Sequence, residues 1–201
     1  MNRFTGLKPG VRAVAMSLMI LSGAELLVAC VPVLVVAATV TTVSVATDRR
    51  TLGRNIDDNT LEVDLRSEFL LDDKLDATHL SVTAINGIVL LTGEVSNDSQ
   101  RQYAEKLAEA NSRTLTVVNE VQLAGTTSLT SRTNDSLITT KVKAKLVNAP
   151  GVKANTVKVV TEAGKVYLLG LVTRSEADAA VAAAQTVGGV THIVKVFEYI
   201  K

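Results

Sequence analysis

The sequence of 201 residues predicts an α+β fold made of two tandem copies of one small domain. Two segments that lie 77 positions apart, 87–95 and 164–172, share the pattern Gly-x-Val-x-Leu-x-Gly-x-Val. The same offset aligns the apolar residues that precede these segments: Leu61, Leu65 and Phe69 align with Ile138, Val142 and Leu146. Because one offset aligns both the helical apolar pattern and the glycine-containing strand pattern, we infer a duplicated domain with the element order α-β-β-α-β.

A helix is expected at the start of each copy. Apolar residues recur every fourth position from Leu61 to Phe69, as they do on the buried side of a helix. Ahead of them, Asp58-Asn59-Thr60 and its counterpart Asn134-Asp135-Ser136 offer side-chain oxygens to free backbone amides. We therefore expect N-caps at these tripeptides, with the two domains spanning residues 58–125 and 134–201.

Two strands joined by a tight turn follow each first helix. In the first copy the alternating runs 80–85 and 88–95 flank Asn86-Gly87, a dipeptide that accepts the positive φ of a hairpin turn. The second copy is expected to turn at Ala163-Gly164. The later glycines of the pattern, Gly93 and Gly170, are expected to allow close approach of another backbone segment. A phosphate-binding loop would instead need glycines between a strand and a helix N-terminus.

The rest of each copy predicts a second helix and a closing strand. The helices are expected at residues 99–109 and 175–185, and the strands at 116–123 and 191–200. Each domain would then hold a small three-stranded mixed sheet packed against two helices. Residues 125–128 form a short polar linker, so we expect the two copies to lie close together.

The N-terminal stretch predicts export and lipid attachment. Basic residues precede the apolar segment 13–20, and small residues then lead to Cys30, which is the layout of a secretory signal. Cys30 is the only cysteine, so it cannot form an internal disulfide. A cut before it would leave a terminal thiol free to carry lipid. We expect residues 1–29 to be a signal peptide and residues 30–57 a lipidated tether.

Two other interpretations of this stretch stay open. Cys30 could be a small buried hydrophobe, as most free cysteines are. Residues 31–46 are also apolar, which leaves an uncleaved membrane anchor as an alternative, and Glu25 is an unusual charge for a signal peptide. Against the anchor, Pro32 and several threonines weaken a helix that is already shorter than the ~20 residues a span needs.

These segments together resemble a known family. The run Leu27-Val28-Ala29-Cys30 resembles the lipobox of bacterial lipoproteins, and the repeated hairpin resembles dual BON-domain outer-membrane lipoproteins of the DolP/YraP type. The resemblance extends from Cys30 to Lys201. It implies a cysteine that is diacylglyceryl-modified and N-acylated, and Val31 after it implies sorting to the outer membrane.

The resemblance also implies a function. It predicts a lipid-anchored protein that faces the periplasm, binds anionic phospholipids (phosphatidylglycerol and cardiolipin) and helps maintain outer-membrane integrity. It allows a link to the outer-membrane protein assembly machinery. Neither the residues nor the resemblance calls for a cofactor or a metal ion.

The two copies differ in charge. Residues 48–125 carry eight basic and fourteen acidic groups, whereas residues 126–201 carry ten basic and five acidic groups. On the aligned first helices, Asp64 and Glu68 of the first copy stand where the second has Lys141 and Lys145. Folding alone gives no reason for this reversal, because the apolar stripe beside it is kept. Opposite signs suggest different partners for the two domains.

The second copy's first helix carries the predicted binding surface. At ~100° per residue, Ile138 and Val142 share the buried face, and a small apolar strip bracketed by lysines falls opposite. Such a face resembles an interfacial lipid-binding surface. The residues expected to bind phospholipid are Leu137, Thr140, Lys141, Lys143, Ala144, Lys145 and Val147. The competing interpretation is that Leu137 and Val147 pack against the other domain or against the ends of their own helix.

The corresponding positions of the first copy are Thr60, Val63, Ser67 and Leu70, with acidic residues at the flanks. Only the second domain is therefore expected to bind lipid. The alternative function is a protein-interaction adaptor, with the acidic first domain facing a basic protein surface.

Other function classes are disfavoured. His79 and His192 occupy non-equivalent positions of the two copies. Neither histidine has a nucleophile or a carboxylate at a sequence spacing typical of a catalytic site, so no catalysis is expected. Asp57-Asp58 and Asp72-Asp73 are too short for a calcium loop. Aromatic residues make up 3% of the chain, which argues against nucleic-acid binding by base stacking.

Overall fold

Both predicted repeats fold as α+β domains in the computed structural model, which describes residues 49–76, 78–124 and 129–201. Residues 48–201 form one compact unit. The signal peptide, Cys30 and the tether up to residue 48 lie outside the described residues, so the expectations for them stay predictions.

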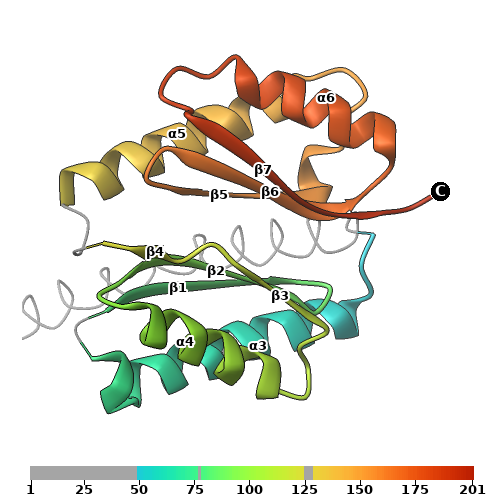
Figure 1. The fold of residues 1–201 in the computed structure, drawn as a ribbon. Helices are drawn as coiled ribbons and strands as arrows, with labels where there is room; N and C mark the ends of the chain where they lie inside the picture. The colour runs from blue at the N-terminus through green and yellow to red at the C-terminus, as the bar shows by residue number, and fades with distance from the viewer. Residues whose placement is uncertain (1–48, 77, 125–128) are drawn as a thin grey trace, which may run out of the picture. The chain divides into compact units, whose positions relative to one another are not determined.

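The element order matches the prediction in both halves (Figure 1). The first half consists of α3 (Leu52–Leu71), η1 (Asp73–Leu75), β1 (His79–Ile85), β2 (Ile88–Val95), α4 (Asp98–Ala110), β3 (Thr116–Asn119) and β4 (Gln122–Leu123). The second half consists of α5 (Leu129–Val147), η2 (Ala154–Thr156), β5 (Val157–Glu162), β6 (Lys165–Val172), α6 (Arg174–Gln185) and β7 (His192–Tyr199). The closing strand of the first half differs from the prediction, because it is split into two strands that both pair with β2.

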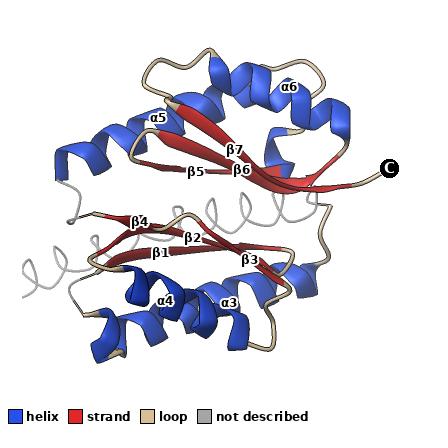
Figure 2. Ribbon diagram, viewed as in Figure 1, coloured by secondary structure: helices blue, strands red, loops and turns tan. Residues whose placement is uncertain are grey.

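Each sheet is mixed. The hairpins β1–β2 and β5–β6 are antiparallel, whereas the closing strands run parallel to β2 and β6. The helix pair of each half covers one face of its sheet (Figure 2). The duplication extends to the strand register, because Leu80 pairs with Gly93 and Val157 pairs with Gly170.

Three apolar clusters hold the unit together. The predicted stripes of α3 and α5 are buried against their own sheets in the first two. The third cluster combines Ile85 and Leu90 of the first half with Tyr167, Leu169 and Val196 of the second. The sheet faces that the helices leave open therefore pack against each other, and the expectation that the copies lie close together is confirmed.

The predicted N-caps are wrong. Helix α3 begins at Leu52, where the Thr51 hydroxyl accepts a hydrogen bond from the Arg54 amide at 3.1 Å, and α5 begins at Leu129. Asp58 and Asp135 thus lie inside their helices, and both are buried. Their carboxylates do accept hydrogen bonds from free backbone amides, but these amides belong to the hairpin turns rather than to a first helical turn.

Each of these aspartates fixes one turn. Asp58 accepts hydrogen bonds from the amides of Asn86 at 2.7 Å and Gly87 at 2.9 Å. Asp135 does the same for the amides of residues 163 and 164, both at 2.9 Å. Arg50 completes the first of these contacts, because its guanidinium lies 2.8 Å from the Asp58 carboxylate. A buried carboxylate that receives two amide hydrogen bonds ties each first helix to its hairpin.

The predicted roles of the glycines are confirmed. Gly87 and Gly164 have φ values of +77° and +75° in the two turns. A Cβ atom on Gly93 would lie 1.9 Å from the carbonyl oxygen of His79, and one on Gly170 would lie 2.1 Å from that of Thr156. The neighbouring strand therefore occupies the space that any side chain would need.

Arg49 joins the start of the first half to the second half. Its guanidinium makes two 2.6 Å contacts with the Glu176 carboxylate and donates to the Leu171 carbonyl at 3.0 Å. Glu176 also closes a capping box with Thr173 at the start of α6. The Arg49 hydrogen bond is the main reason why the pKa of Glu176 falls to about 2, and hydrogen bonds from Thr173 lower it further.

We expect Gly170→Ala to destabilise the unit by about 2–4 kcal/mol, because a backbone carbonyl must move to admit the methyl group. Gly188→Ala is the matched control, since a Cβ there meets nothing within 4 Å, and it should change stability by less than about 0.5 kcal/mol. Urea unfolding of residues 48–201 measures both. Equal effects of the two substitutions would contradict the assigned close approach.

Glu176→Gln should destabilise the same fragment by about 1–2 kcal/mol near neutral pH. A depressed carboxyl pKa stabilises the folded state above the unfolded value, and this contribution is lost as pH falls toward the folded value. The difference between wild type and Glu176→Gln should therefore shrink from about pH 4.5 down to about pH 2. Asp178→Asn, on the exposed side of α6, is the control; a pH-independent difference for Glu176→Gln would refute the assignment.

Candidate functional site

The outward face of α5 carries the residues predicted to meet a lipid surface. The buried stripe Ile138, Val142 and Leu146, each at most 1% exposed, fixes the orientation of the helix. Opposite this stripe, Leu137 is 54% exposed and Val147 is 70% exposed. Their exposure excludes the competing interpretation that the other domain buries them. All seven predicted residues are exposed: Leu137, Thr140, Lys141, Lys143, Ala144, Lys145 and Val147.

The three lysines of this face border its apolar strip. At ~100° per residue, Lys141 and Lys145 lie along one edge and Lys143 lies along the other. Residues 136–147 contain no acidic side chain. Within the described part of the chain, none of the three lysines forms an ion pair. Their charges are therefore available to an external anion, although Lys145 in the last turn also complements the helix dipole.

The corresponding face of α3 is more apolar than the sequence suggested. Four residues project from it at helical spacing and are more than half exposed: Leu52, Ile56, Val63 and Leu70. We missed Leu52 and Ile56, because the helix was expected to start near Asp58 and these residues precede that position. Apolar surface therefore does not distinguish the two helices. The distinction is one of charge, because exposed Asp64 and Glu68 accompany the strip of α3.

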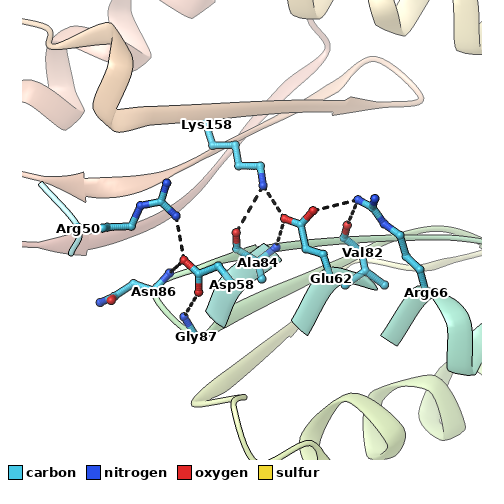
Figure 3. A network of polar contacts seen from close by, with 9 residues as sticks. All are labelled: Arg50, Asp58, Glu62, Arg66, Val82, Ala84, Asn86, Gly87 and Lys158. Atoms are coloured by element: carbon cyan, nitrogen blue, oxygen red, sulfur yellow. Dashed lines mark hydrogen bonds and ion pairs between the residues drawn. The ribbon is translucent and has the colours of Figure 1, made fainter. Parts of the chain in front are cut away.

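Not every lysine of the basic half belongs to an outward surface. Lys158 aligns with Ser81 of the first copy, and its ammonium lies 2.5 Å from the Glu62 carboxylate of α3 (Figure 3). Glu62 also accepts a hydrogen bond from the Ala84 amide at 2.7 Å, and Arg66 contacts its second oxygen at 3.1 Å. Part of the charge difference between the copies therefore serves the contact between the two halves.

A second polar cluster lies on the sheet faces that meet. His79, Glu94 and Glu162 each place one ligand-type atom within 4.8 Å of those of the other two. Beside them is a pocket of about 330 Å³ that includes Arg132 and Asp135 in its lining. The pKa of Glu162 is raised to about 7, mainly by burial and also by the charges of Glu94 and Asp135, while the charge of Arg132 acts in the opposite direction.

The sequence did not reveal this cluster. We interpreted His79 as an isolated polar residue, because Glu162 lies far away in the chain and belongs to the other repeat. Even the adjacent-strand partner, Glu94, is fifteen positions beyond His79.

Among the described residues, no helix combines the length and apolar character of a membrane-spanning segment.

Comparisons with known proteins agree with the duplicated fold. The BON domain family matches residues 57–125 and again residues 134–201. The chain is 40% identical over 157 residues to the outer membrane lipoprotein DolP of Haemophilus influenzae, an alignment that covers 78% of this chain and 81% of that protein. It is 35% identical over 155 residues to the 21 kDa hemolysin of Actinobacillus pleuropneumoniae, covering 77% of this chain and 80% of the relative.

More distant similarities exist. Osmotically-inducible protein Y of Escherichia coli is 28% identical over 145 residues, which cover 71% of this chain and 72% of that protein. Among solved structures, the C-terminal domain of CdsD from Chlamydia trachomatis aligns with a TM-score of 0.29 at 16% identity, covering 72% of this chain and 67% of that one. This TM-score is too low to support an argument.

The family match falls on both repeats and covers most of the chain, and the alignment with the relative from Haemophilus covers 78% of it. The chain therefore belongs to the BON-domain family, as a dual BON-domain protein of the DolP/YraP type.

Proposed function

We propose that this protein is a lipid-anchored outer-membrane protein that faces the periplasm, binds anionic phospholipid through its second BON domain and helps maintain outer-membrane integrity. The outward face of α5 carries the proposal. It combines exposed Leu137 and Val147 with three exposed lysines that have no acidic partner among the described residues. The outer-membrane location and the anchor are supported by the lipobox-like run at Cys30 and by the name of the Haemophilus relative.

The expected affinity of this face is modest. Each lysine near an anionic surface contributes ~1 kcal/mol, and salt screens the attraction. The apolar strip has no Trp or Tyr that could serve as an interfacial anchor. A lipid-modified Cys30 would hold the domain close to the membrane, so its effective concentration there would be high and weak contacts would suffice. Binding is expected to require no cofactor and no catalytic group.

A protein-interaction adaptor is the second candidate function. It is favoured by the exposed strip of α3, which places Val63 and Leu70 at 61% and 85% exposure beside acidic side chains. Apolar surface with negative flanks suits a basic protein partner better than an anionic membrane. In this function the acidic face of the first domain would bind an envelope assembly complex, so the two candidate functions use the outward faces of different domains.

Reversing the lysine charges should abolish membrane binding. We expect the triple substitution Lys141→Glu, Lys143→Glu and Lys145→Glu to weaken binding of residues 48–201 to phosphatidylglycerol or cardiolipin vesicles by about 100-fold or more. Co-sedimentation at low and high salt measures this. The charge-matched control is the triple Lys153→Glu, Lys195→Glu and Lys201→Glu, which alters exposed lysines elsewhere in the same half. If the α5 variant binds vesicles as the wild type does, or if the control variant loses as much binding, α5 is not the membrane-binding surface.

The apolar strips of the two domains should behave differently. Leu137→Ser with Val147→Ser should weaken vesicle binding several-fold, because both side chains would enter the lipid interface. Val63→Ser with Leu70→Ser on α3 should leave it unchanged, since the acids nearby keep that face from an anionic surface. Both variants replace exposed side chains, so neither should lower stability by more than about 0.5 kcal/mol. Loss of vesicle binding in the α3 variant would contradict a role confined to the second domain.

A further inference from the structure

The two halves bring one histidine and two glutamates together on the sheet faces that meet. His79 and Glu94 are directly paired in the antiparallel register of β1 and β2. Side chains alternate along a strand, so His79 shares its sheet face with Ile85, and Glu94 shares it with Leu90. Ile85 and Leu90 belong to the cluster between the sheets. The first half therefore presents an imidazole and a carboxylate side by side toward the second half.

Glu162 supplies the third group from the second half. It is the last residue of β5 and lies on the face that also carries Val160, a residue packed against the shared cluster. Ligand-type atoms of His79, Glu94 and Glu162 all lie within 4.8 Å of one another. In a tetrahedral zinc site with metal–ligand bonds of about 2.05 Å, two ligand atoms lie about 3.3 Å apart. Side-chain adjustments would bring the three groups to this separation.

The burial of these carboxylates needs an explanation. Glu94 is 5% exposed and Glu162 is 8% exposed. Within the described residues, no hydrogen bond reaches the Glu162 carboxylate, which lines the pocket. A buried carboxylate without a hydrogen-bond partner is costly, and a second carboxylate beside it adds repulsion. Both costs would be relieved by a cation bound between them.

The other charged groups of the pocket do not provide this cation. The carboxylate of Asp135 is engaged by the turn amides of residues 163 and 164, so it adds negative charge without pairing with Glu162. Arg132 lines the pocket and lowers the pKa of Glu162 but forms no salt bridge with it. The carboxylates of Glu94 and Asp135 thus act on Glu162 together with one guanidinium, that of Arg132, and a cation bound at Glu162 would offset the repulsion between the carboxylates.

We propose that His79, Glu94 and Glu162 bind one divalent transition-metal ion of the Zn²⁺ type. One imidazole nitrogen and two carboxylate oxygens form a ligand set that zinc accepts, whereas calcium and magnesium favour oxygen ligands alone. The pocket leaves room for water at the remaining coordination position. Because two ligands come from one domain and one from the other, the ion fastens the two halves together.

The repeat does not duplicate this set of ligands. At the repeat offset, the positions that correspond to His79, Glu94 and Glu162 are Thr156, Leu171 and Ile85. Leu171 and Ile85 cannot bind a metal ion. The three ligands thus come from different copies, and only the contact between the sheets brings them together. A single BON domain could not form this site.

Zinc titration of untagged, EDTA-treated residues 48–201 tests the proposal. We expect calorimetry with ZnCl₂ alone to give one site per chain, and zinc to raise the thermal unfolding midpoint. His79→Ala and Glu162→Gln should each weaken zinc binding by more than ~10-fold. His192→Ala is the matched control, because it removes the other histidine, which is exposed on β7, and it should bind zinc as the wild type does.

Glu162→Gln separates metal binding from folding. Without metal this variant should unfold at the wild-type temperature or above it, because it removes a buried charge beside Glu94, yet zinc should no longer raise its midpoint. The proposal is overturned if zinc at about 100 μM neither binds to the wild type nor stabilises it. It is equally overturned if His79→Ala binds zinc normally, if His192→Ala loses binding, or if calcium or magnesium binds as tightly as zinc.

Discussion

The apolar contact between the two sheets decides which surfaces of each domain stay free. Tyr167 is the largest fully buried side chain of the unit, and it lies in this contact with Leu90 and Leu169. Its hydroxyl is directed toward Glu120 of the first half at 3.4 Å, and burial raises the pKa of that hydroxyl. Because each sheet packs on its own helices with one face and on the other sheet with its second face, the helices provide the main outward surfaces. The duplication therefore yields one folding unit rather than two independent modules.

This arrangement explains how two similar domains can serve different purposes. The outward faces of α3 and α5 both carry exposed apolar residues, and their flanking charges are opposite in sign, as Glu68 and Lys145 illustrate at one aligned position. Polar residues that join the two halves are specialised as well. Lys158 and Glu62 hold the halves together at one place, and the proposed zinc ligands do so at another. The isolated second domain would expose Tyr167 and Leu169 to water, so lipid binding is best measured on residues 48–201.

The repeat could be predicted from the sequence, because the conformation of each hairpin depends on local residues. Gly164 adopts the positive φ of the turn, and Gly170 leaves room for the neighbouring strand. The positions of these glycines in the repeated pattern predict both roles. The role of Asp58 could not be predicted, because a carboxylate beside a helix start and one that reaches a distant turn look alike in sequence. The exposed lysines of α5 followed from helical periodicity. The cluster of His79 with Glu162 did not, since it depends on how two sheets pack.

Hydrogen exchange of a Leu90→Ala variant of residues 48–201 tests the shared core most directly. Leu90 belongs to the first domain and is 1% exposed, and removal of its side chain should destabilise the unit by about 2–4 kcal/mol. If the halves unfold together, the slowest amides of β6 in the second domain should exchange faster by the same factor as those of β2, on the order of 10²-fold. Faster exchange confined to the first domain, with β6 unchanged, would contradict the account of a single unit built on the contact between the sheets.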